Sequence, residues 1–186
     1  MGAERDERVE WRLFWAWNDA DEESWLREMA RQGWHLRRAA LFRYVFDRGE
    51  PADVVYKLDY HVLARKDRGE YLGLFRAAGW EHVGEVASWH YFRTPATAGS
   101  DPDIFSDTAS RVAKYKRLLL FLLILLPIFV NSLVTLLARP RPVEGGALSA
   151  ILTGGKVAHV LLVGLWLYAV ARIGVHIRRL QRGPRA

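Results

Sequence analysis

The chain has 186 residues, a formal net charge of +6 and no cysteine, which excludes a disulfide-stapled fold, a Cys-ligated metal site and a thiol nucleophile. Residues 1–110 carry 15 basic and 20 acidic side chains, a net charge of −5, whereas residues 111–186 carry 12 basic and one acidic side chain, a net charge of +11. The basic character therefore belongs to the C-terminal part, where long apolar segments also lie.

Residues 1–93 predict a small α+β domain. A β-rich aromatic run at 9–17 precedes a helix that begins near Asp19 or Asp21 and stops at Gly33. A strand bent near 38–40 is expected over 34–46, and a strand with alternating apolar residues over 53–62. A second helix at 70–78, stopped by Gly79, leads to strands at 80–87 and 89–94.

The two predicted helices end in the same way, at Gly-Trp pairs in positions 33–34 and 79–80. Tyr44 follows the first glycine by 11 residues, and Tyr91 follows the second by 12. This repetition indicates two βαβ-like halves and favours a ferredoxin-like (split βαβ) domain with both helices on one face of the sheet. The tryptophans of the two pairs are expected to seal the helix–sheet junctions.

The remaining chain predicts a linker and two membrane spans. Residues 94–117 form the linker and a juxtamembrane helix that starts near Ser106 or Asp107 and runs into the first span. That span, 118–138, is uncharged, contains ten leucines and is about 30 Å long as a helix, the thickness of a bilayer core. A loop at 139–156, a second span at 157–177 and a basic tail at 178–186 complete the chain.

The basic residues predict the orientation of this hairpin. Four lie at 111–117 and five at 172–185, against three in the loop at 139–156. This bias favours an inner-membrane protein with both termini in the cytoplasm, and the charged N-terminus lacks a secretory h-region. The side chains expected to contact anionic lipid headgroups are Arg111, Lys114, Lys116, Arg117, Arg178, Arg179 and Arg182.

A series of motifs resembles a known family. In chain order they are LFWAWNDADEESWLREMARQGWHL, FRYVF…GEP, VYKLDY, YLGLFRAAGWEHVG, WHYFR and DIFSD…KYKRLLLFLLILLPIF. Over about residues 10–130 the chain resembles the DUF2812 family of bacterial membrane proteins. The resemblance implies a cytoplasmic domain followed by two membrane helices. Members commonly occur beside PadR-like transcriptional repressors, which implies a role in regulation or envelope stress. The family supplies no catalytic residues.

The residues themselves show no catalytic or metal-binding pattern. The sequence contains six histidines but no HExxH, no histidine pair at metal-ligand spacing and no Gly-rich phosphate loop. His35, His82 and His90 lie near the Gly-Trp strands, and surface or hydrogen-bonded roles are favoured over a metal site. We therefore expect no cofactor and no metal, and a protein that is not an enzyme.

Tryptophan is the more informative residue type, because seven of the eight tryptophans fall within the first 90 residues. They could pack against the final strand hairpin, dock a protein partner or a second copy, or stack RNA bases. The negative charge of residues 1–110 argues against nucleic acid. The candidates for partner binding are Trp15, Trp17, Trp34, Trp80 and Trp89.

The leading hypothesis is a membrane-anchored, non-enzymatic regulatory or interaction protein. Its cytoplasmic domain would bind a protein partner, such as a PadR-like transcription factor, through the aromatic residues. The alternative is a membrane-embedded sensor of lipid, amphiphile or envelope stress.

Overall fold

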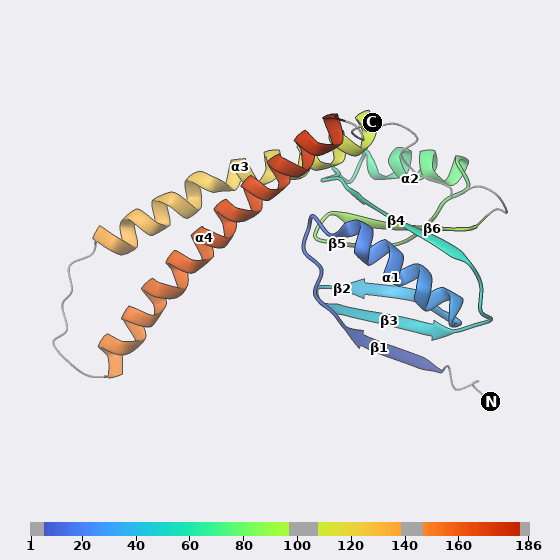
Figure 1. Cartoon of the computed structure of the whole chain (residues 1–186), viewed down its shortest axis with the longest axis horizontal. Coiled ribbons are helices and arrows are strands. Elements are labelled where there is room, and N and C mark those ends of the chain that lie inside the picture. The colour runs from blue at the N-terminus through green and yellow to red at the C-terminus, as the bar shows by residue number, and fades with distance from the viewer. Residues whose placement is uncertain (1–5, 97–107, 139–146, 183–186) are drawn as a thin grey trace. The chain divides into compact units, whose positions relative to one another are not determined.

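The structure is a computed structural model that describes residues 6–96, 108–138 and 147–182. The chain divides into two compact units, Met1–Lys114 and Tyr115–Ala186. In the N-terminal unit the elements follow the order shown in Figure 1: β1 (Glu7–Trp11), α1 (Asp19–Arg31), β2 (Trp34–Ala40), β3 (Arg43–Arg48), β4 (Val54–Tyr60), α2 (Arg68–Ala77), β5 (Glu81–Val86) and β6 (Trp89–Pro95).

The strands of the N-terminal unit form two three-stranded antiparallel sheets, with orders β1-β3-β2 and β4-β6-β5. In each sheet the two outer strands are joined by a helix and run parallel, with one antiparallel strand between them. The unit is therefore a duplicated βαββ, and each half contains the predicted split βαβ. This differs from the predicted ferredoxin-like βαββαβ fold, which has fewer strands than this unit and one sheet in place of two.

The extra strand in the first half arises from a turn that the sequence conceals. The segment 34–46, predicted as one bent strand, is the hairpin β2–β3, and it reverses at Phe42, whose φ is +63°. The β5–β6 hairpin reverses in the same manner at Ala87 and Ser88, with φ of +48° and +67°. Neither turn contains the Gly or Asn that usually adopts this conformation. The β2–β3 turn therefore has no residue by which the sequence could predict it.

Both predicted helix stops are confirmed. Gly33 and Gly79 have φ of +82° and +84°, the left-handed conformation in which a side chain is strained. At Gly33 there is also no room, since a Cβ atom would lie 2.7 Å from the carbonyl oxygen of Gly49. The start of α1 follows Asn18, whose side-chain amide donates to Asp21 at 2.7 Å.

The two helices lie on different faces, contrary to the sequence prediction. Helix α1 packs between the sheets, because its core residue Leu26 belongs to one cluster with residues of both sheets: Leu36, Tyr44, Phe46, Tyr56, Leu58 and Tyr91. Helix α2 covers the opposite face of the second sheet, where Tyr71 packs with Val55, Trp80 and Phe92. Strand β4 is consequently buried on both faces.

The sheets approach each other along β2 and β5, and side chains of the second sheet bind the backbone of the first at Leu36. The Leu36 N–H donates to the Tyr56 hydroxyl at 3.2 Å, and Arg93 donates to the Leu36 carbonyl at 3.4 Å. A register shift between Leu36 and Arg38 marks a bulge at this point. The bulge leaves backbone groups that the opposite sheet satisfies.

The C-terminal unit is built from two long helices, α3 (Thr108–Ala138) and α4 (Ala147–Arg182), of which the first turns of α3 belong to the N-terminal unit. The helices are antiparallel neighbours: the rings of Phe129 and Trp166 stack at 4.5 Å, and those of Tyr115 and His176 meet at 4.5 Å near the other end. The predicted continuous helix from residue 108 into the first apolar segment is confirmed.

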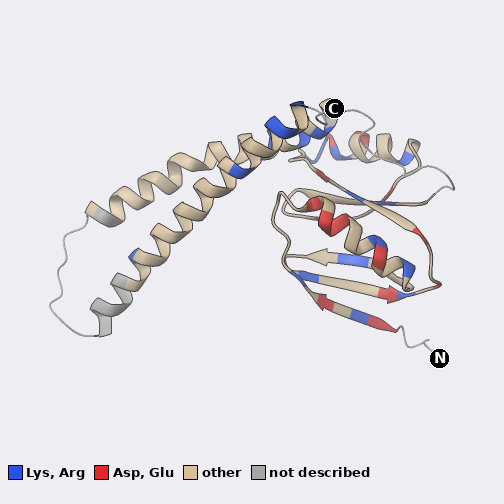
Figure 2. Ribbon diagram, viewed as in Figure 1, with Lys and Arg blue, Asp and Glu red and all other residues tan. Residues whose placement is uncertain are grey.

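Both helices are long and apolar enough to cross a membrane, over Arg111–Leu136 and Gly154–Arg182. Their outward faces are hydrophobic, and Leu161 of α4 is 68% exposed. Helix α4 is longer than the predicted span at 157–177, because the segment before Gly154 contains no proline and continues the helix into the predicted loop. Lys and Arg gather at one end of the helical pair (Figure 2), at the start of α3 and the end of α4.

Candidate functional site

A pocket of about 200 Å³ opens in the N-terminal unit beside the start of α1. Its walls come from the segment between β1 and α1, the β2–β3 and β5–β6 turns, and the facing residues of α1, β3, β4 and β6. Both halves of the duplicated unit thus contribute to it. Its aromatic walls include Phe14, Trp15, Phe42 and Trp89.

The Glu22 side chain of α1 lines this pocket and is hydrogen-bonded to two other polar side chains of its lining, Tyr44 and Tyr91. Glu22 is only 6% exposed, and its Oε1 atom accepts hydrogen bonds from the hydroxyls of Tyr44 and Tyr91, both at 2.7 Å. Tyr44 lies on β3 of the first sheet and Tyr91 on β6 of the second. One carboxylate of the central helix therefore links the two sheets.

Burial makes the charge of Glu22 costly. Loss of solvent raises the pKa of Glu22, and the hydrogen bonds from Tyr91 and Tyr44 offset only part of this rise. Burial and then the charge of Glu22 raise the pKa of both tyrosines, so both hydroxyls stay protonated and can donate to the carboxylate. Among the described residues Glu22 forms no ion pair.

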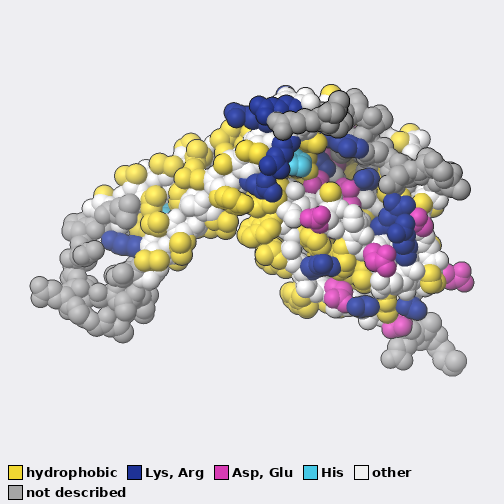
Figure 3. Space-filling view, in the orientation of Figure 1, with side chains coloured by type: hydrophobic (Ala, Val, Ile, Leu, Met, Phe, Trp, Pro, Cys, Tyr) yellow, Lys and Arg dark blue, Asp and Glu magenta, His cyan; other side chains and the backbone are white. Residues whose placement is uncertain are grey.

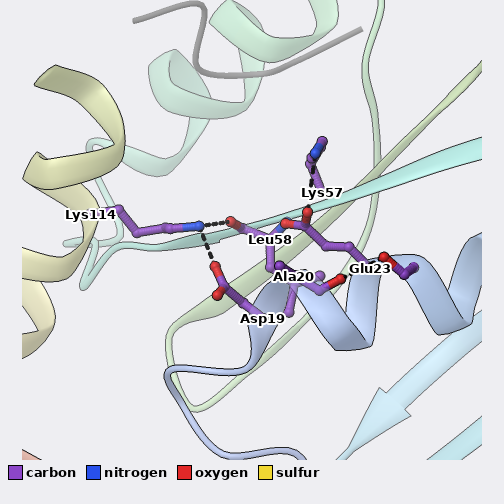
Figure 4. A network of polar contacts seen from close by, with 7 residues as sticks. Asp19, Ala20, Glu23, Lys57, Leu58 and Lys114 are labelled. Carbon is purple, nitrogen blue, oxygen red and sulfur yellow. Dashed lines mark hydrogen bonds and ion pairs between the residues drawn. The ribbon is translucent and has the colours of Figure 1, made fainter. Parts of the chain in front are cut away.

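A second polar network begins at Asp19, which also lines the pocket (Figure 4). Lys114 donates from Nζ to Asp19 Oδ2 at 2.5 Å and to the Leu58 carbonyl at 3.1 Å. On the other side, Glu23 accepts hydrogen bonds from the Leu58 N–H at 2.8 Å and from Lys57 at 3.2 Å. Leu58 lies on β4, an edge strand whose outward backbone groups are thus bound by charged side chains.

The position of Lys114 corrects one sequence prediction. Lys114 was expected to contact lipid headgroups, but its side chain is 7% exposed and its partner Asp19 is 6% exposed. An ammonium enclosed in such an ion pair is not exposed for contact with lipid headgroups. Lys116, two residues further along α3, is exposed and keeps that predicted role.

Trp15 and Trp17 stack on each other, with ring centroids 5.4 Å apart and planes 2° apart. They lie in the connection between β1 and α1 and not in a strand, because β1 ends at Trp11. The β-rich run predicted at 9–17 therefore extends beyond the strand, which ends at Trp11.

Around the mouth of the pocket lies an exposed hydrophobic patch, which we call the aromatic surface. The Arg12 N–H donates to the Phe42 carbonyl at 3.0 Å, which brings the end of β1 beside the β2–β3 turn. Trp11 is 72% exposed and Leu41 is 66% exposed. Figure 3 shows hydrophobic side chains gathered over this edge of the unit. The aromatic surface consists of Trp11, Leu13, Trp15, Leu41 and Phe42.

The other three candidate tryptophans have different surroundings. Trp34 is half-buried on β2, with the guanidinium of Arg48 4.8 Å from its ring centre. Trp80 is buried beside α2, at the junction where the sequence placed it. Trp89 lines the pocket and contacts the Tyr60 ring at 5.4 Å.

The histidines are only partly brought together. His82 and His90 are neighbours, with Nε2 and Nδ1 3.4 Å apart, and burial lowers the pKa of both. His35 instead contacts the Glu50 carbonyl at 2.8 Å. In the described part of the chain, no group of three or more His, Asp or Glu side chains is arranged to hold a metal ion.

Sequence reasoning missed the central residue of the site. Glu22 lies in the acidic first turn of the predicted helix, where carboxylates usually face solvent, whereas Tyr44 and Tyr91 stand at matching positions of the repeat. The usable signal was that repetition, because equivalent residues of two duplicated halves face a common centre when the halves enclose one helix. Both tyrosines in fact bind Glu22.

The family of the chain follows from its sequence profile. Residues 18–126 match the family described as a protein of unknown function, DUF2812. The chain belongs to the DUF2812 family. The match covers more than half of the chain and includes α1 with Glu22, both Gly-Trp pairs and Lys114. No curated protein and no solved structure matches the chain.

Proposed function

We propose that this DUF2812 protein is a membrane-anchored, non-enzymatic regulatory protein whose N-terminal unit binds a protein partner in the cytoplasm. The observation that supports this function best is the aromatic surface. A contiguous patch of exposed tryptophan, phenylalanine and leucine side chains at one edge of a folded unit marks an interaction site, and tryptophan is enriched among the few residues that dominate binding energy at protein interfaces.

The helices α3 and α4 supply the anchor in this proposal. Both termini lie in the cytoplasm, and the protein crosses the inner membrane twice. Basic residues at the shared end of the two helices contact anionic headgroups, each contributing about 1 kcal/mol near the surface. These residues are Arg111, Lys116, Arg117, Arg178, Arg179 and Arg182.

The partner that we propose is a PadR-like transcriptional repressor, the type of regulator that accompanies members of the family. Retention of such a repressor at the membrane would remove it from DNA, so that a change in the membrane-bound protein would alter transcription. A second copy of the chain is the competing occupant of the aromatic surface.

Co-purification of the full-length protein tests this function. The protein and the PadR-like repressor of the same organism are co-expressed, and membranes are solubilised in an uncharged maltoside detergent. The double variant Trp11→Ser, Leu41→Ser should recover at least about tenfold less repressor, because loss of central apolar side chains costs more than 1 kcal/mol each at an interface.

The matched control is the double variant Val62→Ser, Leu74→Ser, whose side chains are 58% and 66% exposed but lie outside the aromatic surface. This variant should recover as much repressor as the wild type. Equal recovery by both double variants would contradict the proposal. Self-association that only the surface variant abolishes would assign the surface to a second copy.

The pocket supports a second candidate function, a sensor of amphiphiles. It opens within the aromatic surface, since Trp15, Leu41 and Phe42 belong to both. A ligand in the pocket would therefore change the surface offered to a partner. A sensor predicts that an amphiphile raises the melting temperature of the full-length protein with saturable dependence on concentration.

A further inference from the structure

Glu22 differs from the other acidic side chains of α1 that are withdrawn from solvent. Asp19 is neutralised by Lys114 at 2.5 Å, and Glu23 is paired with Lys57 at 3.2 Å. Glu22 receives two neutral hydroxyl donors and, in the described part of the chain, no cation. Because buried charges in proteins are normally paired, a carboxylate left in this state beside a cavity is a site for a charge from outside.

The arrangement of the hydrogen bonds leaves one carboxylate oxygen available. Both tyrosine hydroxyls donate to Oε1, and no described residue donates to Oε2. Since Glu22 lines the pocket, a ligand there can reach the carboxylate without displacing either tyrosine. Asp19 lines the same pocket, but its charge is paired with Lys114, so Glu22 is the carboxylate available to a ligand.

The walls of the pocket suit a cation attached to an apolar body. Ring faces attract cations, and two examples already lie in this region. Lys114 Nζ is 6.0 Å from the ring centre of Trp89, and the Arg12 guanidinium is 5.2 Å from that of Phe14. Arg12 is also a lining residue, but it lies over the rings and makes no ion pair with Glu22.

The size of the pocket limits the ligand. Its volume is about 200 Å³, and an apolar cavity of about 150 Å³ takes up benzene. A single aromatic ring with a small ammonium group fits this space, whereas a peptide or a nucleotide does not. The unpaired carboxylate of Glu22 among the lining residues opposes an anionic ligand.

We propose that the pocket binds a small organic cation, an ammonium carried by an apolar group of about one ring, with Glu22 as its counter-ion and Trp89 and Phe42 as its aromatic walls. The inference deepens the second candidate function and rests on it. A substitution can separate it from partner binding, because Trp11 lies on the outer edge of the aromatic surface and is not among the residues that line the pocket.

Titration calorimetry of the full-length protein in an uncharged maltoside detergent tests the proposal. The probe is phenyltrimethylammonium, and the neutral comparison is 2-phenyl-2-propanol, which has nearly the same shape. The cation should bind saturably and at least about tenfold more tightly than the alcohol, since one ion pair desolvated in a pocket contributes this much. Detergent without protein gives the blank.

The variant Glu22→Gln keeps the shape of the side chain and its acceptor for the tyrosines but removes the charge. It should lose the preference for the cation and bind both probes about equally. The matched control Glu28→Gln changes an exposed glutamate of the same helix and should leave the preference intact. If the Glu22→Gln protein fails to fold, Trp89→Leu provides the second test. It should weaken binding of the cation more than binding of the alcohol.

The proposal is overturned if the wild type shows no saturable binding of phenyltrimethylammonium, or if Glu22→Gln keeps the same preference as the wild type. Repressor co-purification with the Glu22→Gln protein separates the two hypotheses. A lost preference for the cation with normal repressor recovery supports this inference by itself. Normal cation binding by the Trp11→Ser protein, with lost repressor recovery, shows that the two sites are distinct.

Discussion

In the first half of the N-terminal unit, helix α1 presents Asp19 and Glu22 to the interior. At the corresponding positions of the second half, counted back from the Gly-Trp pair, Arg65 precedes α2 and Arg68 is the first residue of α2. Arg68 is 43% exposed and pairs with Glu85, which is 31% exposed. The two halves therefore share one architecture and have opposite charges at matching places.

The difference follows from the layers in which the helices lie. Helix α1 is enclosed by both sheets, so a charged side chain on its inner side is buried and needs hydrogen bonds. Helix α2 covers a single face, and Arg68 reaches solvent. In the second half the roles are exchanged: Tyr71 on the helix donates to Asp59 on β4 at 2.9 Å. Only the first arrangement borders the pocket, since Asp59 is not among its lining residues.

The largest effect should come from breaking the buried ion pair of α1. Replacing Lys114 with Met should lower the free energy of unfolding by about 3–5 kcal/mol, because the carboxylate of Asp19 loses the ammonium that neutralises it in the interior. The Leu58 carbonyl loses a donor as well. Urea unfolding of the full-length protein in maltoside, followed by tryptophan fluorescence, measures this change.

Lys116→Met is the matched control for this prediction. Lys116 lies half a turn further along α3 and is exposed, so its loss should change the free energy of unfolding by no more than about 0.5 kcal/mol. Equal effects of the two substitutions would show that Lys114 contributes no more than a surface charge does.

The tyrosines that bind Glu22 should give the next largest effect. Tyr91→Phe removes a hydrogen bond to a buried carboxylate and should lower the free energy of unfolding by about 1.5–3 kcal/mol. The loss should shrink when residue 22 is already Gln, since a neutral acceptor is bound less strongly. Tyr71→Phe, which affects Asp59 of the second half, should cost a similar amount whatever residue stands at position 22. A double-mutant cycle by urea unfolding measures both couplings.

Removing the charge of Glu22 should stabilise the protein at neutral pH. Glu22→Gln should raise the free energy of unfolding by about 1 kcal/mol, because an unpaired buried charge is replaced by a neutral side chain of the same shape. The raised pKa gives the sign of the pH dependence: protonation stabilises the wild type at low pH, and this contribution is lost as the pH rises through the folded-state pKa.

The advantage of Glu22→Gln should therefore be largest at neutral pH and should narrow as the pH falls toward the ordinary glutamate range. Thermal unfolding of the two proteins at a series of pH values measures the difference directly, and groups that titrate equally in both cancel. A constant difference across the series would mean that Glu22 does not change its protonation state in this range.

The sequence predicts the local features of the molecule better than the contacts between distant parts of the chain. Local sequence patterns predict three features: the two helix stops at Gly33 and Gly79, the duplication and the long apolar helices. Glycine conformation and hydropathy act within a few residues, so a short stretch of sequence is enough to recognise them. The β2–β3 hairpin was missed because Phe42 takes a conformation that its residue type disfavours. The burial of Glu22 and Lys114 depends on elements far apart in the chain, since Tyr91 lies 69 residues from Glu22 and Lys114 lies 95 from Asp19.

The smallest effect is expected at the position of the second half that matches Glu22. Arg68→Gln should change the free energy of unfolding by less than about 1 kcal/mol, because the Arg68–Glu85 pair is exposed and screened by salt. Arg68 holds the pKa of Glu85 below its usual range, so the small contribution of this pair is present at neutral pH and is lost as the pH falls. Urea unfolding at low and high salt measures it. An effect as large as that of Tyr91→Phe would mean that α2 is enclosed as fully as α1, and the contrast between the two halves would no longer follow from their layers.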